Sequence, residues 1–285
     1  MSIHPATRIG AVHLTVGDLD LSVAFYEERL GLAAHRREGA VAVLGAGGED
    51  LLVLVEERDA RPASGATGLY HFALLVPSRA ALARALARLE ETGTPLSGAA
   101  DHGVSEALYL SDPDRNGIEI YRDRPQDEWP FEDGELAMTT DPLDLEDLRA
   151  ALDDDPAGDR IDPATAVGHV HLHVSRLDPA RRFYVEILGF EVTQRYGPAA
   201  LFVSAGGYHH HVGLNTWKGV GAPPPPPGST GLRWFELRLP GAAELGRLRG
   251  RLAEAAVAAE ERPGGLLVRD PSDNGVLLTA DAAPA

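Results

Sequence analysis

A chain of 285 residues is long enough for about two domains, and 44% hydrophobic with 24% charged residues is ordinary for a globular protein. It contains no cysteine, which excludes disulfides, thiolate metal sites and a cysteine nucleophile. The net charge of −17 argues against a nucleic acid or an anionic membrane surface as a partner. No apolar run approaches the ~20 residues of a membrane span, and the N-terminus has no signal-peptide pattern, so a cytoplasmic location is expected.

The N-terminal part of the chain predicts one β-α-β-β unit. Apolar and polar side chains alternate over its first strand, so that Val12 and Leu14 face one side and His13 faces the other. Gly31 is typical of the residue that ends a helix, because glycine adopts the left-handed conformation at little cost. The predicted elements are a strand at 9–17, a helix at 19–31 and strands at 41–45 and 50–57.

The next unit has the same order and ends in a tight hairpin. Asp112-Pro113 and Asn116-Gly117 are turn formers between two alternating stretches. Glu119 lies on the outgoing strand, opposite its apolar face, where an unpaired carboxylate would be costly to bury. We therefore expect a basic partner, open solvent or a metal at Glu119. The predicted elements are a strand at 68–77, a helix at 79–93 and strands at 106–111 and 117–121.

The second half of the chain repeats the first. Val12-His13-Leu14 matches Val170-His171-Leu172, and Asp112-Pro113 matches Asp270-Pro271, in each case 158 residues apart. The proline run 223–227 is interpreted as an insertion that forms an extended loop. The predicted fold class is therefore α+β, with four βαβββ modules. The predicted domains are residues 8–124 and 165–281, with two modules each.

An acidic stretch, residues 125–164, joins the two copies. Between Asp127 and Asp162 it carries 14 acidic and two basic residues. We interpret it as a solvated linker, with a short helix near 143–154, because its charge is typical of a segment that stays in water.

The two copies provide an internal comparison. His71 corresponds to Trp234, and Glu119 corresponds to Leu277, so the fold tolerates an apolar residue at both positions. This asymmetry favours a functional role for His71 and Glu119. A neutral imidazole and a carboxylate are two parts of the 2-His-1-carboxylate ligand set of non-haem Fe(II) sites.

A third ligand is needed to complete such a set. His13 and His171 occupy equivalent positions on first strands, and both are candidates. The third module is unusually rich in histidine, with His169, His171 and His173 on one strand face and His209, His210 and His211 further on.

The paired modules, the VHLTV-type first strands and the stretch SDPDRNGIEIY resemble the vicinal oxygen chelate superfamily. Its members include glyoxalase I, fosfomycin resistance proteins, bleomycin-binding proteins and type I extradiol dioxygenases. The segments GLYHFALLVP, DHGVSEALYLSDPDRNGIEIY, VGHVHLHVS and VSAGGYHHHVGLNTW are most similar to its two-domain catechol-2,3-dioxygenase branch of Bacillus type. The resemblance implies two vicinal oxygen chelate domains with curved, partly open mixed β-barrels.

The resemblance also implies a ligand set. The superfamily places metal ligands on the first and last strands of a module, which gives this role to His71 and Glu119. If the first two modules pair, His13 completes the site; if the second and third modules pair across the domains, His171 completes it. We choose His171, because the second pairing also accounts for the surrounding histidines.

Further roles follow from the same resemblance. Tyr109, ten residues before Glu119, is implied to contact the substrate oxygens, and His102 is implied to approach the bound dioxygen. The position of the family's acid–base histidine is occupied here by Glu56. His209 or His211 from the third module is the expected replacement.

The expected function is that of a metal-dependent extradiol ring-cleaving dioxygenase, acting on a catechol-type aromatic diol with O₂. The expected cofactor is Fe(II), with Mn(II) or another divalent metal as an alternative. The expected partners are a small aromatic substrate and O₂, without nucleic acid or membrane, and a homo-oligomer is compatible with the sequence. The rival hypotheses are a glyoxalase-type metal-dependent isomerase or transferase and a non-catalytic aromatic drug-binding resistance protein. The pair His71 and Glu119 counts against the last of these.

Overall fold

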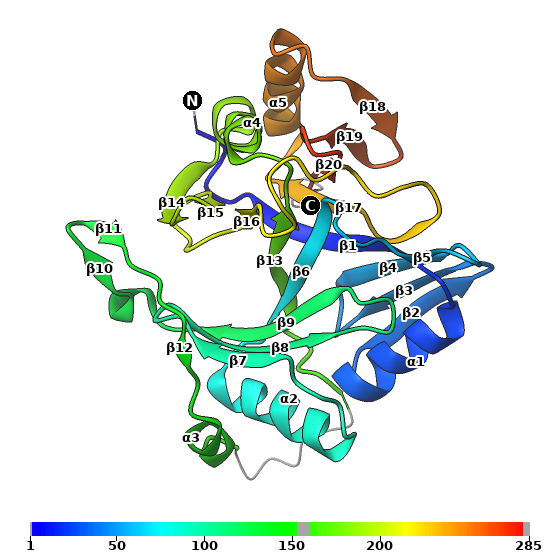
Figure 1. Ribbon diagram of the computed structural model, residues 1–285, viewed down its shortest axis with the longest axis vertical. Helices are drawn as coiled ribbons and strands as arrows, with labels where there is room; N and C mark the ends of the chain where they lie inside the picture. The colour runs from blue at the N-terminus through cyan, green and yellow to red at the C-terminus, as the bar shows by residue number, and fades with distance from the viewer. Residues whose placement is uncertain (1, 153–159, 282–285) are drawn as a thin grey trace.

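The computed structural model describes residues 2–152 and 160–281, which form an α+β fold with two curved, nine-stranded mixed sheets (Figure 1). The first sheet has the order β18 (Ala259–Arg262), β19 (Gly265–Arg269), β20 (Gly275–Ala280), β17 (Ser229–Leu239), β1 (Arg8–Val16), β4 (Asp50–Glu56), β3 (Val41–Gly45) and β2 (Ala33–Glu38), and β5 (Arg61–Pro62) also pairs with β17. The second sheet has the order β12 (Asp141–Pro142), β7 (Gly98–Asp101), β8 (Ser105–Ser111), β9 (Gly117–Asp123), β6 (Gly68–Leu75), β13 (Ala166–His173), β16 (Val212–Asn215), β15 (Ala200–Ser204) and β14 (Glu191–Tyr196). The predicted fold class is confirmed.

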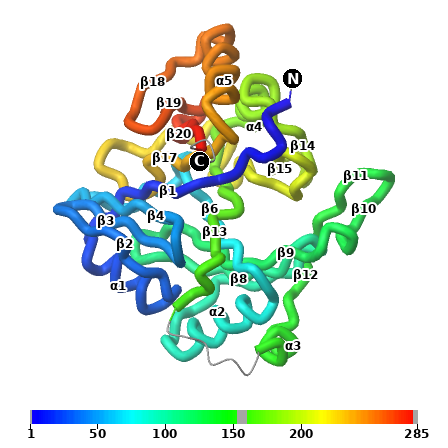
Figure 2. Tube along the Cα trace, turned by 180° about the vertical axis from the view of Figure 1, so that it is seen from behind, coloured from blue at the N-terminus to red at the C-terminus, as the bar shows by residue number. Residues whose placement is uncertain are grey.

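Each module carries helical structure beside its strands, and Figures 1 and 2 both show α2 beneath β8 and β9. The module helices are α1 (Leu19–Leu30), α2 (Arg79–Glu91), α4 (Leu177–Arg181) with the π-helical segment η2 (Arg182–Leu188), and α5 (Ala242–Glu254). The first helix begins and ends as predicted: the Asp18 side chain accepts a hydrogen bond from the Leu21 N–H, and Gly31 has φ 74°, in the left-handed region. No helix in residues 2–152 and 160–281 combines the length and the apolar character that crossing a membrane requires.

The modules pair across the two copies of the repeat. Strand β1 pairs antiparallel with β17, so the first module joins the fourth. Strand β6 pairs antiparallel with β13, so the second module joins the third, and the predicted second pairing is confirmed. The ranges 8–124 and 165–281 are thus two copies in sequence, while each sheet takes one module from each copy.

The turn between β8 and β9 is held from another module. The Tyr26 hydroxyl of α1 donates to Asp112 Oδ2 over 2.8 Å, and the same carboxylate accepts hydrogen bonds from Asn116. The repeat keeps this arrangement, because the Tyr184 hydroxyl donates to Asp270 Oδ2 over 3.2 Å. The turn residues are therefore architectural, as the sequence predicts.

The stretch 125–164 contains more structure than a solvated linker. It forms the 3₁₀ turn η1 (Gln126–Glu128), the hairpin of β10 (Phe131–Glu132) and β11 (Glu135–Leu136), the sheet-edge strand β12, and the helix α3 (Leu145–Ala150). Residues 153–159, the end of the predicted short helix included, lie outside the described residues. The stretch therefore has more regular structure than a linker requires, although most of its described residues are exposed, and the predicted helix is present.

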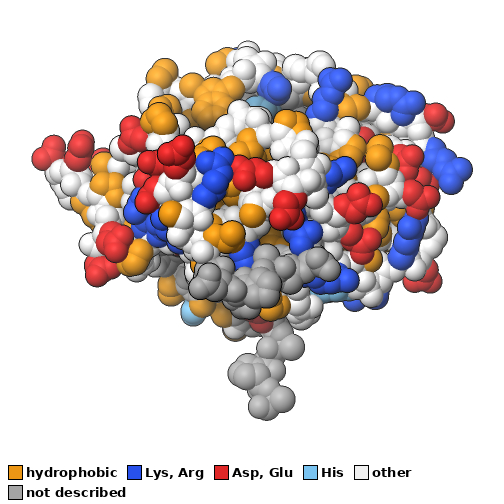
Figure 3. All heavy atoms as spheres, turned by 90° about the horizontal axis from the view of Figure 1, so that it is seen from below, with side chains coloured by type: hydrophobic (Ala, Val, Ile, Leu, Met, Phe, Trp, Pro, Cys, Tyr) orange, Lys and Arg blue, Asp and Glu red, His pale blue; other side chains and the backbone are white. Residues whose placement is uncertain are grey.

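Ion pairs explain why this acidic segment packs on the body. Two ion pairs join α3 to α2: Asp147 of α3 lies 2.8 Å from Arg79 of α2, and Arg149 of α3 lies 2.6 Å from Glu90 of α2. Leu148, which lies between Asp147 and Arg149 in the sequence, is buried. Seen from below, acidic and basic side chains are intermixed over the part of the surface that Figure 3 colours by type.

Candidate metal and substrate site

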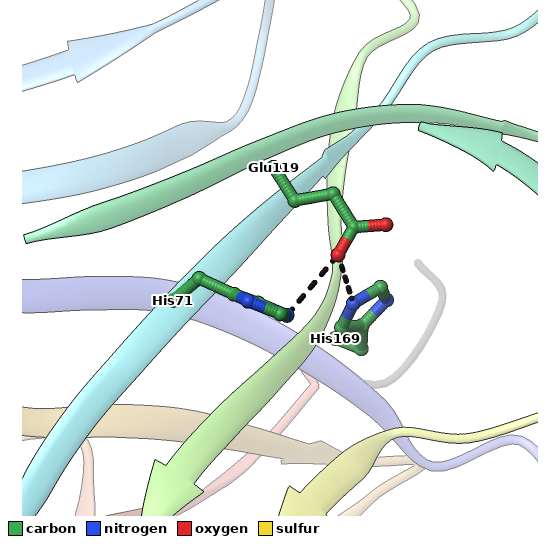
Figure 4. A group of neighbouring side chains, drawn as sticks. All are labelled: His71, Glu119 and His169. Carbon is green, nitrogen blue, oxygen red and sulfur yellow. Dashed lines mark hydrogen bonds and ion pairs between the residues drawn. The ribbon is translucent and has the colours of Figure 1, made fainter. Parts of the chain in front are cut away.

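The central strands of the second sheet bring two histidines and one glutamate together. Across β6 and β9, Ala73 is opposite Glu119, and across β6 and β13, Ala73 is opposite His169. Directly opposed residues point to the same face of a sheet, as does His71, two residues from Ala73 along β6. The small side chain of Ala73 leaves room between the three polar ones, so their polar ends can converge (Figure 4).

The three side chains form a compact buried group. Glu119 Oε2 lies 3.1 Å from His71 Nε2 and 3.1 Å from His169 Nε2 (Figure 4). One ligand atom from each residue lies within 4.8 Å of the others. Despite the short distance to Glu119, the buried His71 Nε2 makes no correctly directed hydrogen bond to any described residue. A divalent cation would satisfy that nitrogen, and two imidazoles with one carboxylate are a common ligand set for such a cation, so these residues fit a divalent metal.

The charges in the group also suit a metal. Burial would raise the pKa of Glu119, but the charge and hydrogen bond of His169, together with His71, lower it well below its usual value. Burial lowers the pKa of His169, which favours the neutral form of its imidazole. An ionised carboxylate and neutral imidazoles are the protonation states that bind metal ions.

The two predicted third ligands lie elsewhere. His171 is opposite His71 in the strand register, whereas Glu119 and His169 are both opposite Ala73, two residues further along β6. The His171 ring packs against Trp217, with the ring centroids 5.3 Å apart. His13 lies on β1 in the first sheet, where its Nε2 is 3.1 Å from Glu236 Oε1. His169, and neither predicted candidate, occupies the third position.

Tyr109 is opposite Glu119 in the strand register, and its hydroxyl contacts His102. His102 Nδ1 donates to the carbonyl of Thr139 over 2.7 Å, which leaves Nε2 as the acceptor. The Tyr109 hydroxyl therefore donates to His102 Nε2 over 2.7 Å. Burial and the nearby Glu119 carboxylate raise the pKa of Tyr109 well above its usual value, so the phenol keeps its proton. Thr139 belongs to the stretch 125–164, so this stretch contributes to the site.

The histidine triplet divides into three environments. His209 is fully buried, and its Nε2 donates to Asp123 Oδ1 over 2.9 Å. His211 turns away, and its Nδ1 accepts a hydrogen bond from the Ala205 N–H over 3.2 Å. His210 is the member of the triplet that lines the cavity described below. Its Nδ1 lies 2.8 Å from His209 Nδ1, which leaves Nε2 free.

A cavity of about 980 Å³ opens in front of this sheet, and His71 and Glu119 line it. Such a volume lies at the upper end of the ~300–1,000 Å³ typical of small-molecule sites. The wall includes the aromatic rings of Tyr70, Trp217 and Phe202. The site therefore combines a metal-binding triad with a pocket that fits an aromatic ligand.

The sequence held a signal for His169. The repeat that aligns His171 with His13 aligns His169 with Ala11. His169 thus shows the asymmetry that singles out His71 and Glu119, whereas His171 does not. For His210 the only signal was its place in the triplet, and for Thr139 there was none.

Comparisons with known proteins agree with this geometry. A family model described as the glyoxalase/bleomycin resistance protein/dioxygenase superfamily matches residues 8–120 and 166–275. The chain is 44% identical to the catechol-2,3-dioxygenase of Bacillus subtilis (strain 168) over 275 residues, which cover 95% of this chain and 96% of that protein.

Solved structures share the fold. A crystal structure from Bacillus subtilis subsp. subtilis str. 168 has a TM-score of 0.65 at 16% identity and covers 97% of this chain and 86% of that chain. Glyoxalase I from Zea mays has a TM-score of 0.59 at 16% identity, with 96% of this chain and 92% of that chain covered. At these identities the matches support the architecture and not the reaction.

Proposed function

We propose that this chain, which belongs to the glyoxalase/bleomycin resistance protein/dioxygenase superfamily, is a metal-dependent extradiol dioxygenase that cleaves a catechol-type aromatic diol with O₂. The observation that carries the proposal is the buried triad of His71, Glu119 and His169 beside an aromatic cavity. The 44% identity to a catechol-2,3-dioxygenase extends over 95% of the chain, so it includes both strands and loops of this site.

We infer that the resident metal is Fe(II), with Mn(II) as the alternative, held by His71 Nε2, His169 Nε2 and the Glu119 carboxylate. A divalent ion held there would stabilise the deprotonated diol and would supply Lewis acidity for binding the substrate oxygens and O₂. Imidazoles bind a metal in their neutral form and the carboxylate carries one negative charge, so a divalent ion would keep a net positive charge in the site. That charge favours an anionic diol over a neutral one.

The protein groups around the triad then handle protons and orientation. His210 is the proposed base, because its Nδ1 is tied to His209 and its Nε2 is left for the substrate hydroxyl. Asp123 holds His209 in turn, which fixes the ring of His210 from behind. Tyr109 keeps its proton and donates it to His102 Nε2, so its hydroxyl oxygen is the proposed acceptor for a hydrogen bond from a substrate hydroxyl.

The test is ring cleavage by the metal-loaded protein. With Fe(II) and catechol in air, we expect oxygen uptake and a yellow ring-fission product. Glu119→Ala should lose both the metal and the activity while its circular dichroism spectrum stays unchanged. An iron-loaded protein that consumes no oxygen with any catechol, but isomerises a hemithioacetal, would refute the proposal in favour of the glyoxalase-type alternative.

We further infer a small aromatic substrate and O₂ as the partners of the site, and action in the cytoplasm. A homo-oligomer stays a prediction, which size-exclusion chromatography with light scattering would test.

A further inference from the structure

We propose that the substrate carries an anionic substituent on its catechol ring, recognised by Lys218 and Arg115 at the rim of the cavity. This inference rests on the proposed function and names the substrate class of the same site. Both residues line the cavity, and neither side chain forms a hydrogen bond or an ion pair with any residue in 2–152 or 160–281. Lys218 is also the only lysine in a chain of net charge −17.

An aromatic wall leads from the triad to Lys218. The ring centroids of His71 and His171 are 5.1 Å apart, and those of His171 and Trp217 are 5.3 Å apart. Tyr70 packs on Trp217 with centroids 5.1 Å apart. Lys218 directly follows Trp217, so a flat ring bound near the triad and lying along this wall would direct a substituent toward the ammonium group.

Arg115 lies at the same end of the sheet. It lies two residues before the start of β9 at Gly117, and Gly117 is opposite His71. Lys218 follows the end of β16, where Asn215 is opposite His173. Strand β9 runs parallel to β6, so both strands start at the same edge of the sheet. Strand β13 runs antiparallel to β6, and β16 runs parallel to β13, so β13 and β16 end at that edge. The start of β9 and the end of β16 therefore lie at the same rim of the cavity. The two strands are separated by three strand spacings, or about 14 Å, so the two cations flank the cavity mouth.

The acidic residues of the cavity do not neutralise this pair. Three carboxylates line it, and Glu119 belongs to the triad. Glu57 is paired with Arg233 at 2.9 Å. The Asp114 carboxylate accepts a hydrogen bond from the Gly17 N–H over 3.2 Å, so it is held toward the first module. Lys218 and Arg115 are left to attract an anion.

The spacing sets the size of the substituent. His173, beside Lys218, is four residues along β13 from His169, which corresponds to about 13 Å along a strand. A lysine side chain reaches back over part of that length, so the anionic group should lie on the order of 10 Å from the diol oxygens. A carboxylate on a short alkyl chain opposite the diol meets this requirement, and the cavity of about 980 Å³ has room for it.

The experiment compares two substrates that differ only in charge, 3,4-dihydroxyphenylpropanoate and its methyl ester. For the iron-loaded wild type we expect a lower KM for the acid. Lys218→Met should raise the KM for the acid about fivefold and leave the ester unchanged, which is the usual effect of one partly exposed ion pair. Arg115→Met should act in the same direction, and Lys218→Arg should retain the preference. Arg182→Met removes an exposed charge that does not line the cavity and serves as the matched control.

The inference is overturned if the wild type handles acid and ester equally, or if Lys218→Met affects both substrates to the same extent. Failure of the proposed function looks different, because neither compound would then be cleaved. In that case isothermal titration of the two compounds into wild type and Lys218→Met still decides the inference. A preference for the acid that disappears in the variant supports it, and equal dissociation constants refute it.

Discussion

Replacing His169 by alanine should remove the metal, whereas replacing His171 should not. The two residues make a matched pair, because they are buried imidazoles two positions apart on the same face of β13. Of these two histidines, only His169 contacts Glu119, with 3.1 Å between its Nε2 and Glu119 Oε2. His171 packs on Trp217, and its Nε2 has no hydrogen-bond partner among the described residues.

The magnitudes follow from these contacts. Residues that only support a ligand change metal affinity about 10–100-fold when mutated, so loss of a direct ligand should weaken affinity by at least about 100-fold. His171→Ala should stay within about tenfold, because this residue lies beside the triad and not in it. Without metal, His169→Ala also takes one of two partners from a buried carboxylate, which should lower the free energy of unfolding by about 1–3 kcal/mol.

Both variants would be loaded with Fe(II), dialysed against buffer and assayed for bound metal, ring cleavage and thermal unfolding with and without the ion. His171→Ala should show the metal-dependent rise in melting temperature, and His169→Ala should not. A wild-type metal content in His169→Ala, or an equal loss in both variants, would show that the third ligand has been misassigned.

Other variants test the neighbouring groups. Tyr109→Phe should lower kcat at least about tenfold with little change in KM or metal content, measured by steady-state oxygen uptake, because it removes one hydroxyl from the substrate oxygens. His210→Asn should lower kcat about 100-fold at unchanged metal content, as expected for loss of a general base. Burial lowers the pKa of His211 to about 3 in the folded protein. As the pH drops, His211 is therefore protonated in the unfolded chain before it is protonated in the folded one. The free energy of unfolding should fall between about pH 6.5 and about pH 3. His211→Phe should flatten this dependence by on the order of 5 kcal/mol in urea titrations at several pH values, and an unchanged slope would rule out His211 as its source. Tyr26→Phe should cost about 1 kcal/mol of unfolding free energy by the same method, through the lost bond to Asp112, with metal content unaffected.

The sequence carries the module order because alternation, helix ends and turn formers are local signals. The repeat adds a comparison that local patterns lack, and this comparison identified His71 and Glu119. The prediction that His171 is the third ligand relied on its alignment with His13 in the repeat. The alignment of His169 with Ala11, a position that cannot bind a metal, was the better signal. The register of β13 on β6 decides the matter, and that register contains shifts between Val167 and His169 and between His171 and Leu172 that no pattern in the sequence predicts.

Long-range polar contacts were equally out of reach of pattern analysis. The acidic stretch 125–164 was expected to stay in water because its composition is that of a solvated segment. Most of its described residues do stay exposed, but Asp147 and Asp162 also pair with arginines of α2, Arg79 and Arg84. Strand β2 was missed as well, because the residues AAHRRE at a sheet edge are mostly exposed and lack an apolar face.

Packing explains why only one of the two sheets carries the triad. In the first sheet the equivalent positions are Ala11, Trp234 and Leu277, so no ligand atoms converge there. The polar residues that remain satisfy each other, since Glu236 lies 3.1 Å from His13 and 3.3 Å from Arg238. Arg238 supplies the positive charge that a metal would otherwise provide, so the Glu236 carboxylate is paired without an ion.

Among the described residues, the second sheet has no arginine in that role, and its carboxylate faces two imidazoles that have two unpartnered nitrogens, His71 Nε2 and His169 Nδ1. The triad also needs both copies of the repeat, because His71 and Glu119 come from residues 8–124 and His169 from residues 165–281. The stretch that joins the copies therefore does more than connect them. It allows the second and third modules to pair, and its Thr139 carbonyl fixes the tautomer of His102 beside the completed site.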